Sequence, residues 1–220
     1  MAAPTAFLID VYETILTCDF SAHAVELPAL AGVDTRLWNE TFMPLGPSLT
    51  DGRMTVAQAF ATVLERCGRQ PTDDLVQALV ERDRELLVRW SQLFEDTVPF
   101  LELLREKGVR VALVSNCSDT TRALLEHLQV DRLVDAMVLS CEVGWAKPAP
   151  EIFKRALQDI EADPAECVFV DDQARFCAGA LALGVPTVQI ARGAHPDEQG
   201  QLVAQGATLA RSFAELEGLL

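Results

Sequence analysis

This sequence has few basic residues and no long apolar run, and both absences exclude classes of protein. Its 220 residues include 18 Lys and Arg against 33 Asp and Glu, which gives a net charge of −15. Nucleic-acid affinity depends largely on Lys and Arg that neutralise phosphates, so we expect no nucleic-acid partner. No stretch of about 18 apolar residues is present, so we expect no membrane span. The opening MAAPTAFLID lacks a positive flank, which predicts no secretory signal and a cytoplasmic location.

The cysteines and histidines also lack the spacing of metal or redox motifs. No CxxC pair occurs among Cys18, Cys67, Cys117, Cys141, Cys167 and Cys177. We interpret these cysteines as reduced thiols that pack as small apolar residues. The three histidines, His23, His127 and His195, have no ligand spacing, and we expect them at the surface without a functional role.

Short apolar runs alternate with helical patterns in the second half of the chain. The runs lie at 109–116, 135–140, 166–172 and 186–191, and helical patterns lie between them at 119–130, 150–160 and 174–184. This alternation predicts an α/β fold with a doubly wound parallel sheet and helices on both faces. The stretch FLID at 7–10 is expected to be the first strand of the same sheet.

Residues 18–96 have a different character, because they are amphipathic with a helical period and contain no strand candidate. We expect this segment to form a helical cap domain inserted into a core domain of residues 1–17 and 97–220. We favour a cap over a binding site rather than helices that only cover an edge of the sheet. The segment leaves and returns at the carboxyl end of the first strand, where open α/β sheets bind ligands.

Polar residues follow the ends of four predicted strands. They are Asp10, the pair Ser115 and Asn116, Lys147 before Pro148, and the pair Asp171 and Asp172. Any one of them alone is compatible with a helix cap or a turn. Their occurrence together, in this order and each at a strand end, indicates a single site.

This pattern resembles the haloacid dehalogenase (HAD) superfamily, in particular its members with a helical cap inserted after the first motif. That superfamily has an Asp after the first strand, then a Ser or Thr, a Lys before a Pro, and an acidic pair. The stretches KPAPEIFKRAL at 147–157 and VFVDDQARFCAGALALGV at 168–185 are similar over many consecutive positions. The resemblance spans essentially the whole chain and implies a hydrolase with a Rossmann-type core.

The chemistry expected of these residues is covalent catalysis at a carboxylate. Asp10 can attack phosphorus or an activated carbon and form an aspartyl intermediate that water hydrolyses. A doubly charged phosphate repels a carboxylate, so the attack needs a countercharge, which Mg²⁺ held by Asp10 and Asp172 would supply. The resemblance implies that the backbone carbonyl of Tyr12 is a further metal ligand.

The remaining motif residues are expected to act on the transferring group. Lys147 would neutralise negative charge on the substrate, while Ser115 and the Asn116 amide would donate hydrogen bonds to it. Asp171 would orient a water or Lys147 without binding the metal.

Tyr12 departs from the phosphatases of the family, which usually have an Asp two residues after the nucleophile. That Asp is a general acid and base, a role worth about 10²- to 10⁴-fold. A phenol of pKa about 10 is a poor base at neutral pH. Three alternatives remain: a phosphohydrolase whose acid comes from Glu13 or the cap, a 2-haloacid dehalogenase, or a non-catalytic binding protein. DVYET at 10–14 resembles the first motif of the dehalogenases, whose halide leaves without a proton.

The acidic pair favours the phosphohydrolase. Dehalogenases of this superfamily work without metal. The resemblance implies that they have a Ser–Asn-type sequence at the positions where this chain has Asp171 and Asp172. Adding Asp10 makes three carboxylates in a small space, which is costly without a cation. We therefore expect a Mg²⁺-dependent phosphatase that acts on a small anionic metabolite, as a monomer or homodimer. Phe176 replaces an acid that phosphatases often add, which predicts weaker metal binding.

Overall fold

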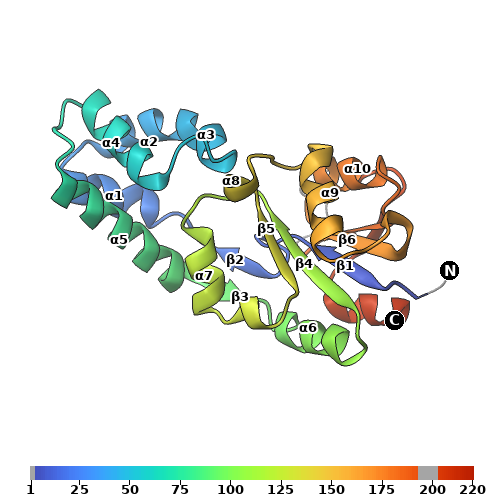
Figure 1. The fold of residues 1–220 in the computed structure, drawn as a ribbon. Helices are drawn as coiled ribbons and strands as arrows, with labels where there is room; N and C mark the ends of the chain where they lie inside the picture. The colour runs from blue at the N-terminus through green and yellow to red at the C-terminus, as the bar shows by residue number, and fades with distance from the viewer. Residues whose placement is uncertain (1–2, 193–202) are drawn as a thin grey trace.

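Six parallel strands form a sheet in the middle of the molecule (Figure 1). The computed structural model describes residues 3–192 and 203–220. The order across the sheet is β5–β4–β1–β6–β7–β8. The strands are β1 (Ala6–Ile9), β4 (Arg110–Ser115), β5 (Ala136–Leu139), β6 (Cys167–Asp171), β7 (Thr187–Ile190) and β8 (Thr208–Ala210). The predicted parallel α/β fold is confirmed, and its first strand pairs with β4 and β6.

Helices cover both faces of the sheet, and β1 contributes side chains to each face. Phe7 and Ile9 belong to a core shared with α6 (Thr97–Glu106), α7 (Thr121–His127) and a C-terminal 3-10 helix (Phe213–Leu219). Ala6 and Leu8 belong to a second core shared with α9 (Pro150–Asp159) and α10 (Ala174–Leu181). Successive side chains of a strand point to opposite faces, so a strand buried on both faces must be apolar throughout.

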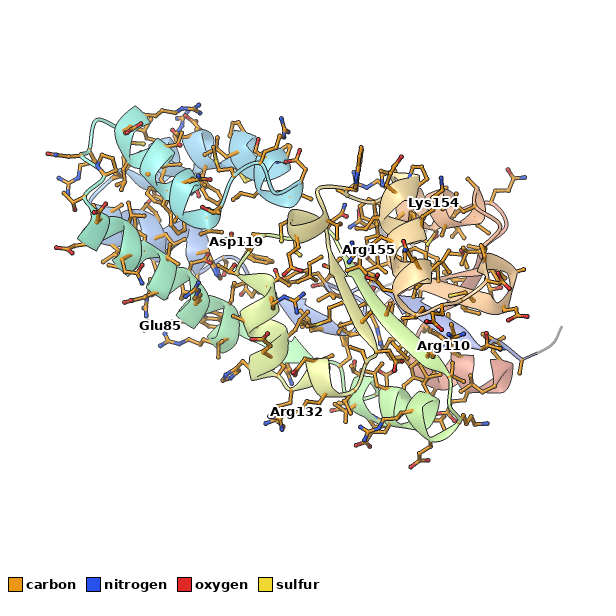
Figure 2. All side chains as sticks on the ribbon, in the orientation of Figure 1. Glu85, Arg110, Asp119, Arg132, Lys154 and Arg155 are labelled. Atoms are coloured by element: carbon orange, nitrogen blue, oxygen red, sulfur yellow. The ribbon has the colours of Figure 1, made fainter. Side chains whose placement is uncertain are left out.

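Five helices between β1 and β4 form a separate group at one end of the molecule (Figure 1). We call α1–α5 the helical segment. It consists of α1 (His23–Ala31), α2 (Thr35–Phe42), α3 (Gly46–Thr50), α4 (Val56–Arg66) and α5 (Asp73–Trp90). Its core contains Trp38, Phe60 and Leu79. Asp119, in the loop before α7, accepts a hydrogen bond from the backbone of Val56 at 2.9 Å and joins the segment to the sheet domain (Figure 2).

Three short strands were not expected from the sequence. β2 (Leu16–Cys18) and β3 (Ser91–Leu93) pair in antiparallel fashion where the chain enters and leaves the helical segment, and β8 extends the main sheet. The expectation of no strand in 18–96 was therefore wrong. Each of the three strands has only three residues, which is too short for an alternating pattern to stand out.

Two further features are a short helix that was not expected from the sequence and the state of the cysteines. The short helix α8 (Ser140–Val143) follows β5, and all six cysteines are free thiols. Within the described ranges, none of the helices combines the length and apolar character that a membrane span requires.

Candidate active site

The carboxyl ends of three neighbouring strands bring predicted site residues together, and two of these strands carry the acidic ones. Asp10 follows β1, and Asp171 and Asp172 lie at the end of β6, the strand next to it. Carboxylate oxygens of these three residues all lie within 4.8 Å of one another. Ser115 ends β4 on the other side of β1. This edge of an open α/β sheet is where ligands bind.

Lys147 is buried in the middle of this cluster. Its Nζ donates to Asp10 Oδ1 at 2.5 Å and to Asp171 Oδ2 at 2.6 Å. The ammonium also lies 5.6 Å from the ring centroid of Phe169 and 5.0 Å from that of Phe176. Burial by itself would lower the pKa of Lys147, but the two carboxylates outweigh it and raise the pKa. The lysine therefore stays charged at neutral pH and is no surface residue.

Asn116 positions the backbone of this lysine. Its Nδ2 donates to the Lys147 carbonyl at 2.9 Å, and its Oδ1 accepts from the Lys147 N–H at 2.7 Å. Both atoms of the side-chain amide are thus engaged with the protein. A hydrogen bond from Asn116 to a substrate could come from its main-chain N–H or from the second proton of Nδ2.

Two hydroxyl groups complete the surroundings of Asp10. Thr14 Oγ1 donates to Asp10 Oδ2 at 3.0 Å, so both oxygens of this carboxylate are held. Sequence reasoning missed Thr14, although its place within DVYET was a signal. Ser115 is fully buried, and its Oγ has no hydrogen-bond partner among the described residues. A buried unpaired hydroxyl at this edge is available to a ligand.

The turn after Asp10 directs Glu13 away from the site. Glu13 has φ of 59°, in the left-handed region that favours glycine. Its side chain is exposed and accepts a hydrogen bond from Thr17 Oγ1 at 2.9 Å. Glu13 therefore does not replace the missing acid.

Tyr12 also does not take that role. Its hydroxyl lies 3.0 Å from Thr121 Oγ1 at the start of α7, and its ring lies 6.0 Å from the ring of Phe20. Burial raises the pKa of the Tyr12 phenol above its ordinary value, so it stays protonated.

The acidic cluster fits a hard divalent cation. Asp172 Oδ1 is buried and has no hydrogen-bond partner within the part of the chain that the structure describes. Burial raises the pKa of Asp172 to about 6. Lys147 offsets only one of three formal negative charges, and Mg²⁺ prefers carboxylate oxygens. Asp172, with its unpaired oxygen, and Asp10 beside it are the candidate ligands, while Asp171 accepts hydrogen bonds from Lys147 Nζ and from the Gln173 N–H at 2.8 Å.

A cavity of about 540 Å³ lies between this edge of the sheet and the helical segment. Tyr12, Asn116 and Thr121 line it on the sheet side, and Trp38 lines it from α2. Arg36, also on α2, points to solvent with its side chain 85 % exposed and pairs with Glu40.

His23 is not a surface residue, contrary to the expectation from the sequence. It is 9 % exposed and lines the cavity, with Nε2 3.7 Å from Asp83 Oδ1. The missed signal was its spacing with Leu27 and Ala31, which places all three on the apolar stripe of α1. His127 is exposed as expected, and His195 lies outside the described residues.

In the pair of His23 and Asp83, only the aspartate is charged at neutral pH. Burial lowers the pKa of the His23 imidazole, which is therefore neutral at pH 7. Burial raises the pKa of the Asp83 carboxyl to about 6, so Asp83 carries the charge of the cavity at pH 7.

Comparison with known proteins shows which family this chain matches. Residues 4–184 match the family model of haloacid dehalogenase-like hydrolases. The chain is 28 % identical over 200 residues to the glyceraldehyde 3-phosphate phosphatase of Methanopyrus kandleri, covering 87 % of this chain and 86 % of that protein. It is 26 % identical over 202 residues to the (S)-2-haloacid dehalogenase 4A of Burkholderia cepacia, covering 88 % and 85 %.

A solved structure of the same fold contains both magnesium and inorganic phosphate. It is a mutant of a HAD family enzyme from Bacteroides thetaiotaomicron, 25 % identical to this chain. The TM-score is 0.70, over 89 % of this chain and 98 % of that one.

Because the pKa of Asp83 is raised in the folded protein, we expect the free energy of unfolding to fall as pH rises from about 4 to about 6. Its folded pKa of about 6 lies above the ordinary value of 3.8, so the folded state binds more protons in this window. We expect the free energy of unfolding of Asp83→Asn, relative to that of wild type, to be roughly 1 to 3 kcal/mol higher at pH 7.5 than at pH 4. Urea unfolding at both pH values measures the difference. Glu85→Gln, on the outer face of the same helix (Figure 2), should show no such change, and a pH-independent difference for Asp83→Asn would contradict the assignment.

Proposed function

The chain belongs to the haloacid dehalogenase-like hydrolases, and we propose that it is a Mg²⁺-dependent phosphatase for a small phosphorylated metabolite. One observation carries this proposal: Asp10, Asp171 and Asp172 converge within 4.8 Å, and a single lysine lies among them. An acidic cluster of this kind favours a cation, and a cation at the nucleophile favours a phosphorylated substrate. The similarity to a phosphatase and to a solved structure that contains magnesium and phosphate supports the same proposal.

In the proposed reaction Asp10 is the nucleophile. One of its oxygens forms a bond to phosphorus while the ester oxygen leaves with the bonding electron pair, and water then attacks phosphorus and restores the carboxylate. Lys147 and Thr14 orient Asp10, because each donates to a different oxygen. When bound by Asp10, Asp172 and the Tyr12 carbonyl, Mg²⁺ supplies the positive charge that lets a carboxylate approach a phosphate.

The other site residues would stabilise the transferring phosphoryl group. Lys147 provides a fixed ammonium beside Asp10, and the unpaired Ser115 hydroxyl is a hydrogen-bond donor in the same place. Such donors are most effective when they are buried and oriented before the reaction. Asp171 acts through Lys147, which it holds at 2.6 Å.

A 2-haloacid dehalogenase is the second candidate, and Tyr12 and the dehalogenase relative favour it. Two observations oppose it. The acidic pair gives the site more negative charge than a reaction without metal can tolerate. In addition, no Lys or Arg occurs among the described residues that line the cavity, so the carboxylate of a haloacid would have no countercharge there.

The nucleophile is tested by Asp10→Asn. We expect hydrolysis of phosphate esters to fall by roughly 10³-fold or more in kcat, because an amide cannot form the aspartyl intermediate. Circular dichroism checks that the fold is retained, and Asp74→Asn, an exposed change on α5, should keep full activity. Near wild-type turnover by Asp10→Asn would rule out this role.

The metal is tested by chelation and by Asp172→Asn. We expect activity to disappear in excess EDTA and to return with Mg²⁺, and Asp172→Asn to require at least about tenfold more Mg²⁺ for half-maximal activity. A screen of phosphate esters and 2-haloacids, with and without Mg²⁺, provides the measurement. Turnover of haloacids that survives EDTA would instead identify a dehalogenase.

The missing acid is tested by Tyr12→Asp. We expect this change to raise kcat on alkyl phosphates by about 10²-fold, with little effect on 4-nitrophenyl phosphate, because only a poor leaving group needs protonation. Tyr12→Phe is the control, since it removes the hydroxyl beside Thr121 without adding an acid. If alkyl phosphates gain nothing while Mg²⁺ dependence is retained, protonation of the leaving group does not limit the enzyme.

A further inference from the structure

We propose that the 540 Å³ cavity binds an apolar leaving group that carries no negative charge and directs a hydrogen-bond donor to Asp83. This inference rests on the proposed phosphatase function, because it concerns the part of the substrate that departs from phosphorus. The cavity is in the right place for that part. Its wall includes Tyr12, two residues after Asp10, and Asn116, whose side chain holds the backbone of Lys147.

Most of the cavity wall is apolar. Trp38, Phe42, Leu49 and Leu87 line it from α2, α3 and α5. Two further lining residues, Phe20 and Met43, are 51 % and 73 % exposed. Large apolar side chains that gather around a cavity and remain exposed to water are typical of a surface that a ligand covers.

Three polar atoms of the cavity lack hydrogen-bond partners in the described part of the chain, whereas other polar groups in its wall, such as the Tyr12 hydroxyl and the Asn116 side chain, are bonded within the protein. Both ring nitrogens of His23 and Asp83 Oδ2 are buried and have no hydrogen-bond partner among the described residues. The Oδ1 atom of Asp83 lies 3.7 Å from His23 Nε2, beyond a normal hydrogen bond. Buried polar atoms are nearly always paired, so these atoms point to a group that the ligand brings. A hydroxyl or an ammonium group would satisfy Asp83.

The charge of the cavity excludes an anionic leaving group. Asp83 contributes a negative charge, and none of the described lining residues is a Lys or Arg. Of the basic residues on either side of Asp83, Arg82 pairs with Glu26 and Glu85, and Arg84 is exposed to solvent, from where its charge partly offsets the effect of burial on the pKa of Asp83. A carboxylate or a second phosphate in this apolar space would be repelled by Asp83 and would lose its hydration without gaining a countercharge. The phosphoryl group itself is bound outside the cavity, beside Lys147.

Three aryl phosphates that differ at one substituent, chiefly in its charge, test the inference. They are 4-ethylphenyl phosphate, 4-(2-aminoethyl)phenyl phosphate and 4-(carboxymethyl)phenyl phosphate, which are neutral, cationic and anionic at this substituent. With wild-type enzyme and Mg²⁺, we expect kcat/KM for the first two to exceed that for the third by at least about tenfold, and the amine to be best. Asp83→Asn should remove the advantage of the amine over the ethyl compound. Glu85→Gln removes the same charge from the outer face of α5 and should leave the ranking unchanged (Figure 2).

Binding of the corresponding phenols gives a readout that needs neither metal nor turnover. Because Trp38 lines the cavity, quenching of tryptophan fluorescence can follow 4-ethylphenol, tyramine and 4-hydroxyphenylacetate. We expect the first two to bind at least about tenfold more tightly than the acid. This order, combined with no cleavage of any phosphate ester, would support the cavity assignment and refute the phosphatase. Cleavage of all three esters with equal efficiency, or a preference for the acid, would overturn the cavity assignment and leave the phosphatase standing.

Discussion

The buried ammonium of Lys147 between Asp10 and Asp171 is the interaction on which the rest of the site depends. A buried lysine is tolerated only when opposite charges surround it, and a carboxylate buried beside other carboxylates needs a cation. The three residues therefore stabilise one another, and removal of Lys147 would leave two buried carboxylates without a countercharge. Phe169 and Phe176 line the other side of the ammonium and exclude water from it. The nucleophile is held in one orientation as a result.

The order of the strands brings this ion pair together and also sets the place of the cavity. β1 lies between β4 and β6, so Asp10 has the polar ends of two neighbouring strands beside it. The chain leaves β1 through the left-handed turn at Glu13 and enters the helical segment through β2, which pairs with the returning strand β3. The helical segment is thereby anchored next to the nucleophile. The wall of the cavity under this segment accordingly includes Tyr12, two residues after Asp10, and Asn116, which binds the backbone of Lys147.

Sequence reasoning predicted the sheet and the acidic cluster because both have local signals. Apolar runs alternating with helices predicted the parallel sheet, and each candidate residue follows a strand end. The contact of Thr14 was missed because it depends on how the turn after Asp10 folds back onto that residue, and the contact of the Asn116 side chain was missed because its partner lies 31 residues later in the chain. His23 was placed at the surface because no partner stands near it in sequence, and Asp83, its neighbour in space, lies on another helix. Burial between two helices has no signature in either helix alone.

Tyr12 connects the chemistry of the site with the character of the cavity. It is the only tyrosine of the chain, and its ring forms part of the cavity wall while its hydroxyl meets Thr121. A carboxylate at this position would add a second negative charge to a cavity that already contains Asp83, whereas a phenol extends the apolar wall towards Asp10. Under the proposed function, the same residue removes the general acid and favours an aromatic leaving group. These two effects agree, because an aryl oxygen leaves more readily without protonation than an alkyl oxygen does.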